Sequence, residues 1–293
     1  MSKIGITADS SSCIAYAPFK HTVKITKTTI DFNGQILTDG VDVTADQFYE
    51  MLEKTDIIPT TAAPVVGEIN DRCLEWKKEG KEEVIHFPIS SGLSAYGPNM
   101  AIMTDELFPD IKVTFFPTKQ VCIMQAYLAH YAEILASHGV TTDEIIAKCD
   151  AFQKQIHSYF IVDNLRYLVK NGRLKVLSGF VGQLMNIKPI LIINDEGEIV
   201  PFEKVRTKNK AVDRIIDLVC ENNKQYKKGI YVCLHAHRED EAYAIIERIK
   251  ARTSNALRYE VSTITPTVGA HIGSGLLGVT FIPLDDLEYQ DEI

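Results

Sequence analysis

The sequence has no excess of positive charge and no long apolar run. Its 293 residues include 31 Lys and Arg against 39 Asp and Glu, which gives a net charge of −8. Proteins that bind nucleic acids or anionic membrane surfaces through charge carry a basic patch, so we expect neither as the main partner. The apolar runs, such as residues 190–193, are far shorter than the roughly 18 residues of a membrane-spanning helix. The composition therefore predicts no stable membrane insertion.

Cysteine pairs and a secretion signal are also missing. The opening residues, MSKIGITADS, lack the apolar core of a signal peptide, so we expect a cytoplasmic protein. The six cysteines form no C-x-x-C pair, which favours buried free thiols over disulfides or a metal site. They are Cys13, Cys73, Cys122, Cys149, Cys220 and Cys233.

The motifs of common cofactors are absent as well. The sequence contains no P-loop, no H-E-x-x-H and no EF-hand loop. The first predicted strand is followed by residues 8–12 (ADSSS), where a dinucleotide site would carry glycines. His235 and His237 fall at the end of a predicted strand, so their side chains point to opposite faces and do not suit one metal. We expect neither a cofactor nor a metal.

The first half of the chain alternates short apolar strands with longer helical patterns. We predict strands at residues 3–7, 83–89, 112–116 and 159–162. Capping boxes, Thr44 with Gln47 and Thr141 with Glu144, indicate two helix starts, the second helix running to about residue 157. Further helices are predicted from Pro64 to a stop at Gly80 and, as a long amphipathic helix, over 120–138. This alternation is typical of a largely parallel sheet covered on both faces.

The second half is less regular. Strands are predicted at residues 189–193 and 199–202, joined by a turn at 195–197, which makes a hairpin. The remaining predicted elements are helices at 165–170, 211–226 and 239–251, and strands at 230–234, 258–263 and 279–282. The length also favours two domains. We therefore predict an α/β protein with a parallel-sheet N-terminal domain over 1–160 and a mixed α+β C-terminal domain over 161–293.

Three polar loops follow or flank the predicted strands. They are residues 59–64 (PTTAAP), 90–94 (SSGLS) and 269–278 (GAHIGSGLLG). Their hydroxyls, free backbone N–H groups and imidazole suit a carboxylate or phosphate group. Each loop also has a structural explanation: a helix cap at Thr61, a capped turn at the serines, and a glycine-rich turn with an exposed histidine.

The same residues allow a second interpretation. Ser94 could act as a nucleophile, with His271 as its base and Asp9 orienting the imidazole, as in a hydrolase of acyl esters. Ser94 does not lie in a G-x-S-x-G motif, which weakens this hydrolase hypothesis. A regulatory module that only senses a ligand is a third alternative.

In order and spacing, these segments resemble the DegV family, the fatty-acid-binding proteins that act with bacterial fatty acid kinase. The resemblance extends over about residues 3–283, in ITADSSS, PTTAAP, SSGLS, YFIVDNLRYLVKNGRL, KVRTKNKA and GAHIGSGLLGVTF. It implies two α/β domains that hold a long-chain fatty acid between them. It also implies a carrier rather than an enzyme, which presents the carboxyl group to a separate kinase for acyl phosphate formation.

The resemblance also assigns residues. Thr61 and Ser94 would hydrogen-bond the carboxylate, with Ser91, Gly92 and His271 close by. Arg173 and Arg206 resemble the kinase-facing basic residues, although both could be ordinary solvated arginines. The fatty acid tail would lie among apolar side chains between the domains, to which residues 184–193 could contribute.

This sequence departs from the usual family pattern at two places. Residues 62–63 are both alanine, where a serine and a glutamine are common, and residues 95–99 read AYGPN, where GTYQS is usual. Both changes lie beside the predicted carboxylate site, so they affect which lipid is bound and whether the kinase partnership is retained.

Overall fold

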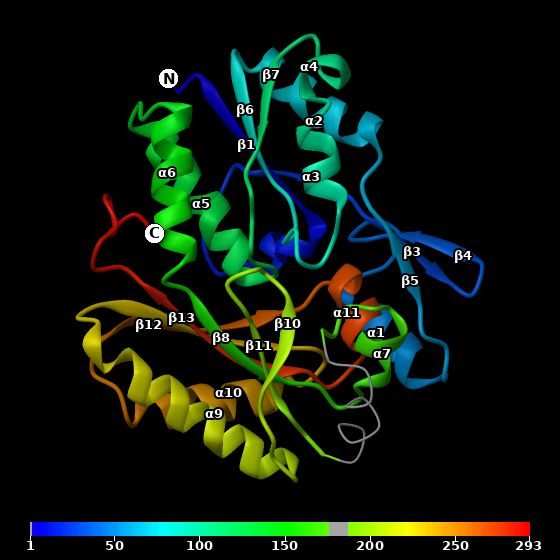
Figure 1. Cartoon of the computed structure of the whole chain (residues 1–293), viewed down its shortest axis with the longest axis vertical. Helices are drawn as coiled ribbons and strands as arrows, with labels where there is room; N and C mark the ends of the chain where they lie inside the picture. Colours follow the sequence, from blue (N-terminus) through cyan, green and yellow to red (C-terminus); the bar gives the residue numbers. More distant parts are fainter. Residues whose placement is uncertain (1, 176–186) are drawn as a thin grey trace.

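The computed structural model describes residues 2–175 and 187–293. Figure 1 shows two large sheets, one above the other, with helices on both sides of the upper sheet and below the lower sheet. The strands of the upper sheet come from the first half of the chain, and those of the lower sheet come from the second half. The predicted fold class is confirmed.

The upper sheet has four parallel strands in the order β2-β1-β6-β7. Its strands are β1 (Ile4–Asp9), β2 (Lys24–Thr26), β6 (Glu83–Phe87) and β7 (Lys112–Phe115). The helices α2 (Val66–Lys78), α3 (Tyr96–Ala101) and α4 (Thr104–Leu107) lie on one side of it, and α5 (Ile123–Ser137) and α6 (Thr142–Gln153) on the other. This is the predicted parallel sheet covered on both faces.

The lower sheet is mixed and has six strands in the order β10-β9-β8-β13-β11-β12. They are β8 (His157–Ile161), β9 (Ile190–Ile193), β10 (Ile199–Glu203), β11 (Gly229–His235), β12 (Ala256–Thr263) and β13 (Leu277–Pro283). Its outer face is covered by α9 (Lys208–Asn222) and α10 (Glu239–Lys250). The predicted hairpin is present as the antiparallel pair β9 and β10, which confirms the mixed character.

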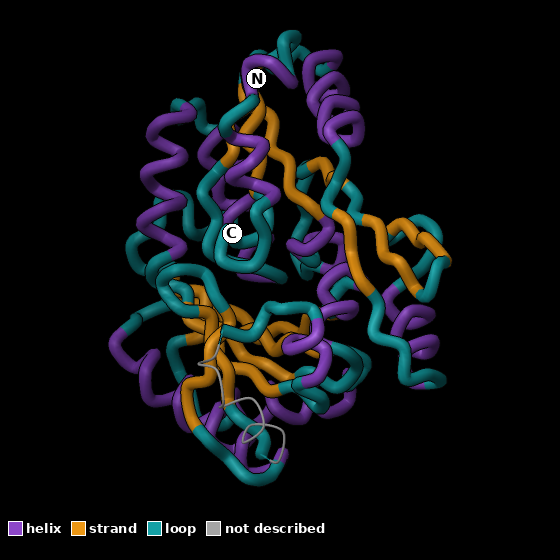
Figure 2. The backbone as a smooth tube through the Cα atoms, turned by 45° about the vertical axis from the view of Figure 1, so that its right-hand side comes forward, coloured by secondary structure: helices purple, strands orange, loops and turns teal. Residues whose placement is uncertain are grey.

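A third, small sheet was not predicted from the sequence. It joins β3 (Thr29–Phe32), β4 (Gln35–Thr38) and β5 (Thr60–Ala62) and stands out at one side of the molecule (Figure 2). The turn between β3 and β4 is Asn33-Gly34, and both residues have positive φ, 57° and 88°. Three further short helices lie near this sheet: α1 (Ala45–Glu53), α7 (Arg166–Lys170) and α11 (Pro266–Ile272).

Helix α5 differs from its predicted form. It begins at Ile123 rather than at residue 120, and every residue except Glu133 and Ser137 is buried, so it is not amphipathic. The reason is its position between the two sheets, where its sides meet apolar residues of both. The following helix, α6, ends at Gln153, earlier than predicted, because His157 already starts β8.

Several local predictions hold. Both capping boxes form, at Thr44 with Gln47 and at Thr141 with Glu144. Helix α2 begins at Val66, two residues after the predicted start, and Gly80 follows its end with φ of 83°. All six cysteines are free and buried. Over the described ranges, every helix is too short or too polar to cross a membrane.

Candidate functional site

A cavity opens where the ends of β1 and β6 approach the small sheet and α11. We call it the front cavity; it holds about 750 Å³ of empty space, part of it open to solvent. Polar side chains from segments far apart in the sequence line it, namely Asp9, Ser11, Thr28, Thr61, Ser94, Arg173, Thr267 and His271. The strand ends converge here because parallel strands present their carboxyl ends at one edge of the sheet.

Thr61 and His271 are in direct contact in the lining of this cavity. The Thr61 hydroxyl and His271 Nε2 are 2.8 Å apart, whereas His271 Nδ1 is buried with no hydrogen-bond partner in the described part of the chain. Burial, and to a lesser degree the nearby charge of Arg173, lowers the pKa of His271 to about 4. The imidazole is therefore neutral at pH 7 and carries one ring proton that can be donated.

Two of the three predicted loops contain regular structure. Residues 60–62 form β5, which pairs with β3 and thereby fixes Thr61. His271 lies on the last turn of α11, not in a glycine-rich loop; that loop is limited to residues 273–276. Gly273 and Gly275 there have positive φ, 74° and 92°. Both polar groups are thus carried by regular elements, which position them more firmly than loops would.

The loop after β6 is held by the hairpin of the lower sheet. The hydroxyl of the buried Ser90 donates to the carbonyl oxygen of Gly197 at 2.7 Å. A Cβ on Gly92 would come within 2.6 Å of the Gly197 backbone, so only glycine fits without a shift. Ser94 lines the front cavity, whereas Ser91 and Gly92 are exposed residues outside its lining. The structure therefore brings together Thr61, Ser94 and His271, and places Ser91 and Gly92 beside them.

Ser94, His271 and Asp9 do not form the triad of the hydrolase hypothesis. Asp9 is fully buried and accepts hydrogen bonds from the backbone N–H of Ser11 (2.9 Å) and of Ile89 (2.7 Å), not from His271. Burial raises its pKa, and these hydrogen bonds oppose the rise. The Nε2 of His271 is bonded to Thr61 rather than to Ser94. Asp9 instead fixes the two strand ends that line the cavity.

The two predicted partner-facing arginines lie in different places. Arg173 is exposed at the front cavity, and its Nε donates to the carbonyl oxygen of Leu93 at 3.1 Å. Arg206 is exposed at a separate surface hollow that Asn164 and Lys188 also line. Arg173 is thus beside the predicted ligand site, and Arg206 is not part of its lining.

A second cavity adjoins the first and was not predicted as a cavity. This apolar cavity has about 420 Å³ of empty space and shares Val121, Ile199, Val268 and Ile272 with the front cavity. Its other walls come from the start of α5, the inner face of the lower sheet and the end of α11; they include Cys122, Met124, Ser158, Phe160, Ile193, Leu234, Ile264 and Leu276. Of the tail region predicted at 184–193, Ile193 lines it, and residues 184–186 lie outside the described residues.

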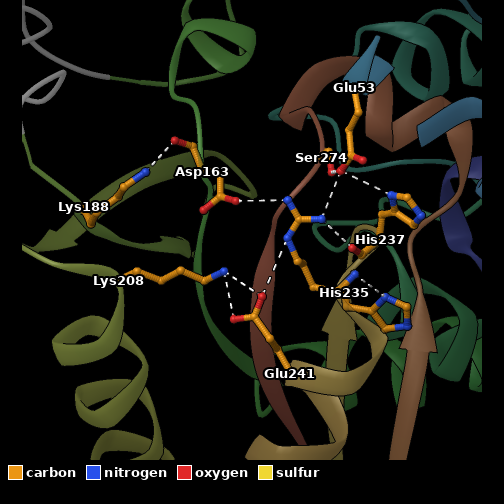
Figure 3. A network of polar contacts seen from close by, with 9 residues as sticks. Glu53, Asp163, Lys188, Lys208, His235, His237, Glu241 and Ser274 are labelled. Atoms are coloured by element: carbon orange, nitrogen blue, oxygen red, sulfur yellow. Dashed lines mark hydrogen bonds and ion pairs between the residues drawn. The ribbon is translucent and has the colours of Figure 1, made fainter. Parts of the chain in front are cut away.

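A cluster of charged residues holds the turn that follows α11. Glu53, at the end of α1, accepts hydrogen bonds from Ser274 Oγ at 2.6 Å and from Arg238 at 3.0 Å. Figure 3 shows Glu53, Ser274 and His237 close together, with Asp163 on the opposite side of the cluster. The bond from Ser274, followed by those from Arg238 and His237, lowers the pKa of Glu53 to about 2. The cluster therefore ties the helix that carries His271 to α1.

A cavity with polar groups at one end and apolar walls beyond has the form of a binding site for a small molecule with one polar end. The chain belongs to the DegV family: the family model described as "Uncharacterised protein, DegV family" matches residues 3–284. Protein DegV of Bacillus subtilis is 32% identical over 283 residues, 94% of this chain and 98% of that protein. A DegV domain-containing protein of Listeria monocytogenes is 31% identical, over 95% of this chain and 98% of that protein.

Solved structures agree with this assignment. The chain is similar to the fatty acid binding DegV family protein of Streptococcus agalactiae, with a TM-score of 0.85, 27% identity, and coverage of 97% of this chain and 99% of that one. It is also similar to DegV of Bacillus subtilis, described as a fatty acid binding protein, with a TM-score of 0.84, 29% identity, and coverage of 97% and 100%. Both resemblances include the full two-sheet architecture.

Proposed function

We propose that the protein binds a long-chain fatty acid and presents its carboxyl group to a separate fatty acid kinase for acyl phosphate formation. One observation carries the binding part of this proposal. The front cavity has hydroxyls and an imidazole, and the adjoining cavity has almost only apolar walls. A fatty acid has the same two parts in the same order. The related structures described as fatty acid binding support the same ligand.

The apolar tail supplies most of the affinity. Each buried methylene contributes about 0.8 kcal/mol, so a tail of ~14 methylenes contributes on the order of 10 kcal/mol before the costs of binding. The tail would run from the shared residues Val121, Ile199, Val268 and Ile272 into the apolar cavity. The polar end then has to orient the ligand rather than to hold it.

Thr61, Ser94 and His271 would orient the carboxylate. If His271 carries its proton on Nδ1, Nε2 accepts from Thr61 and the free Nδ1–H can donate to the ligand. If the proton is on Nε2, it donates to Thr61, and the Thr61 hydroxyl is free to donate. Either tautomer leaves one donor for an anion, and Ser94 adds another. Ser91 and Gly92 would support the loop that carries Ser94.

Presentation of the carboxyl group to a kinase requires that this group be accessible from outside the protein. The front cavity is partly open to solvent, and the exposed Arg173 lies at its lining. We assign Arg173 and Arg206 to contacts with the kinase. In this proposal the protein is a carrier without catalytic residues of its own, and it needs no cofactor or metal. We place it in the cytoplasm, where its fatty acid kinase would be.

Extraction of freshly purified protein under denaturing conditions, followed by mass spectrometry, tests the ligand directly. We expect about one long-chain fatty acid per protein. An empty extract, together with no uptake of added fatty acids, would contradict the proposal.

A double variant tests the head-group assignment. Thr61→Val with Ser94→Ala removes the Ser94 donor, worth about 1.5–3 kcal/mol. It also removes either a second donor, Thr61, or the bond from Thr61 that orients the His271 donor, according to the tautomer. We therefore expect fatty acid affinity to fall by about 100-fold. Thr60→Val is the matched control, because Thr60 is the exposed neighbour on β5 outside the cavity lining. Unchanged affinity in the double variant would overturn the assignment.

The kinase part and the hydrolase alternative need separate tests. Arg206→Ala should leave fatty acid affinity unchanged and slow acyl phosphate formation by a bacterial fatty acid kinase; an unchanged rate would remove Arg206 from the partner surface.

A fluorophosphonate should leave Ser94 unlabelled in the folded protein. Labelling of Ser94 would support the hydrolase instead.

A further inference from the structure

The apolar cavity has one hydroxyl in its wall that makes no hydrogen bond within the described part of the chain. Ser158, on β8, lines this cavity and is 7% exposed. Its Oγ is buried and lacks a hydrogen-bond partner among the described residues. Leaving a buried hydroxyl unpaired destabilises a folded protein, and native structures contain few such groups. Because Ser158 lies in the wall of a cavity, a ligand that enters the cavity can supply the missing hydrogen-bond partner.

The neighbours of Ser158 in residues 2–175 and 187–293 offer it no such partner. In the sheet register Ser158 lies opposite Thr280, and the Thr280 hydroxyl donates to the carbonyl oxygen of His157 at 3.1 Å. Ser158 and Phe160 lie on the same face of β8, because side chains alternate along a strand. Phe160 is opposite Gly278, and a Cβ on Gly278 would lie 2.7 Å from the Phe160 Cβ, so the two strands pack closely there. The cavity is where a ligand atom can reach Ser158.

Ser158 lines only the apolar cavity and is not among the residues that this cavity shares with the front cavity. One of the residues shared with the front cavity is Ile272. Five residues further along the chain, Leu277 begins β13 and lies opposite Ile161 of β8. Ser158 lies three residues away from Ile161 on the same strand, opposite Thr280 of β13. A group that reaches Ser158 must therefore belong to the chain of the ligand rather than to its carboxylate.

We propose that Ser158 selects a long-chain fatty acid whose chain carries a hydroxyl or keto oxygen. This inference rests on the proposed fatty acid binding. An oxygen at the matching position would pair with the Ser158 hydroxyl, whereas a plain chain leaves that hydroxyl unpaired. A site that contains a buried hydrogen-bonding group discriminates against the analogue that lacks its partner. The class of ligand is thus an oxygenated long-chain fatty acid.

A positional series tests the proposal on the full chain. Affinities are measured for octadecanoic acid and for monohydroxy-octadecanoic acids that differ only in the position of the hydroxyl. We expect one narrow range of positions to bind about threefold to tenfold more tightly than octadecanoic acid, the effect of one net hydrogen bond. Positions outside that range should bind more weakly, because they place a hydroxyl against apolar walls.

Two serine variants then identify the group responsible. Ser158→Ala should abolish the preference for the hydroxylated chain, because no hydroxyl remains to pair with it, while octadecanoic acid still binds. Ser262→Ala is the matched control, because Ser262 lies on the same face of the sheet and its Oγ is also buried and unpaired among the described residues, but it is outside the cavity lining. It should keep the preference. Ser158→Cys provides a second variant of similar size, with a weaker donor and an intermediate preference.

The outcomes separate the two proposals. If octadecanoic acid binds but no hydroxylated position binds more tightly, or if the preference survives in Ser158→Ala, the inference is wrong and the proposed function stands. If no fatty acid of the series binds, the proposed function is wrong and the inference falls with it.

Discussion

At the scale of single residues, Gly92 shows how closely the two sheets meet beside the cavity. A methyl group at this position would lie 2.6 Å from the Gly197 backbone, which cannot move aside as a flexible side chain could. We expect Gly92→Ala to lower the free energy of unfolding by about 1–3 kcal/mol, as overpacking does. Urea unfolding of the purified variant measures this.

Gly67 is the matched control for that substitution. It lies in the first turn of α2, and a methyl group there would have open space for 4 Å around it among the described residues. Gly67→Ala should be neutral or stabilising by up to about 1 kcal/mol, because alanine favours the helix. If both variants lose the same stability, the contact with Gly197 is not what makes Gly92 necessary.

The sequence grouped Thr61, Ser94 and His271 through the chemistry of their polar loops and through the family resemblance. In the structure all three line one cavity. The sequence was not sufficient to predict that His271 sits on a helix or that its Nε2 bonds Thr61, since this contact joins residues 210 positions apart. The unpaired Ser158 could not be recognised either, because pairing of a hydroxyl depends on the packed neighbours.

At the scale of elements, α11 is anchored at its start by a buried carboxylate. Asp39 follows β4, and its Oδ2 accepts from the Thr267 backbone N–H at 3.0 Å. Burial raises the pKa of Asp39 from 3.8 to about 6, although the bonds from Thr267 oppose this rise. Because its pKa is raised in the folded state, folding binds a proton between about pH 4 and 6. Stability from this group is therefore present below pH 4 and is lost as the pH rises through about 6.

The variant Asp39→Asn should remove this pH dependence. Its free energy of unfolding, relative to the original protein, should rise by about 2–3 kcal/mol between pH 4 and pH 7. Urea unfolding at several pH values measures the difference. Asp42→Asn is the control: Asp42 is exposed and its pKa is lowered by bonds from Thr38, so its contribution changes only as the pH falls below about 4. A flat difference for Asp39→Asn between pH 4 and 7 would contradict the assignment.

Elements with a strong local signal were predicted well. The capping boxes at Thr44 and Thr141 marked true helix starts, because the bonds of a capping box join residues only three positions apart. The Asn33-Gly34 hairpin also has a local signal, a dipeptide typical of tight turns, although its strands were not predicted. The burial of α5 has no local signal, since Glu133, His130 and Gln125 give it a mixed composition. Their burial depends on partners far along the chain, such as Phe87, whose carbonyl oxygen accepts from Gln125.

At the scale of the whole molecule, α5 joins the two sheets. Gln125 Nε2 donates to the carbonyl oxygen of Phe87 in the upper sheet at 2.9 Å, and Tyr127 donates to Glu260 in the lower sheet at 2.5 Å. One apolar core contains residues of both sheets together with α5. A domain boundary near residue 160, which falls within β8, stays a prediction.

This shared core predicts that both sheets unfold together. The single tryptophan, Trp76, is buried on the outer side of the upper sheet and donates to the carbonyl oxygen of Ile6 at 3.1 Å. Its fluorescence therefore reports the upper sheet, whereas far-ultraviolet circular dichroism reports the whole chain. We expect the two urea transitions to coincide. Added fatty acid should shift both by the same amount, because a ligand between the sheets stabilises only the state in which both are folded. An earlier transition in fluorescence, or a shift of one signal alone, would show that the sheets unfold independently and that α5 belongs to one of them.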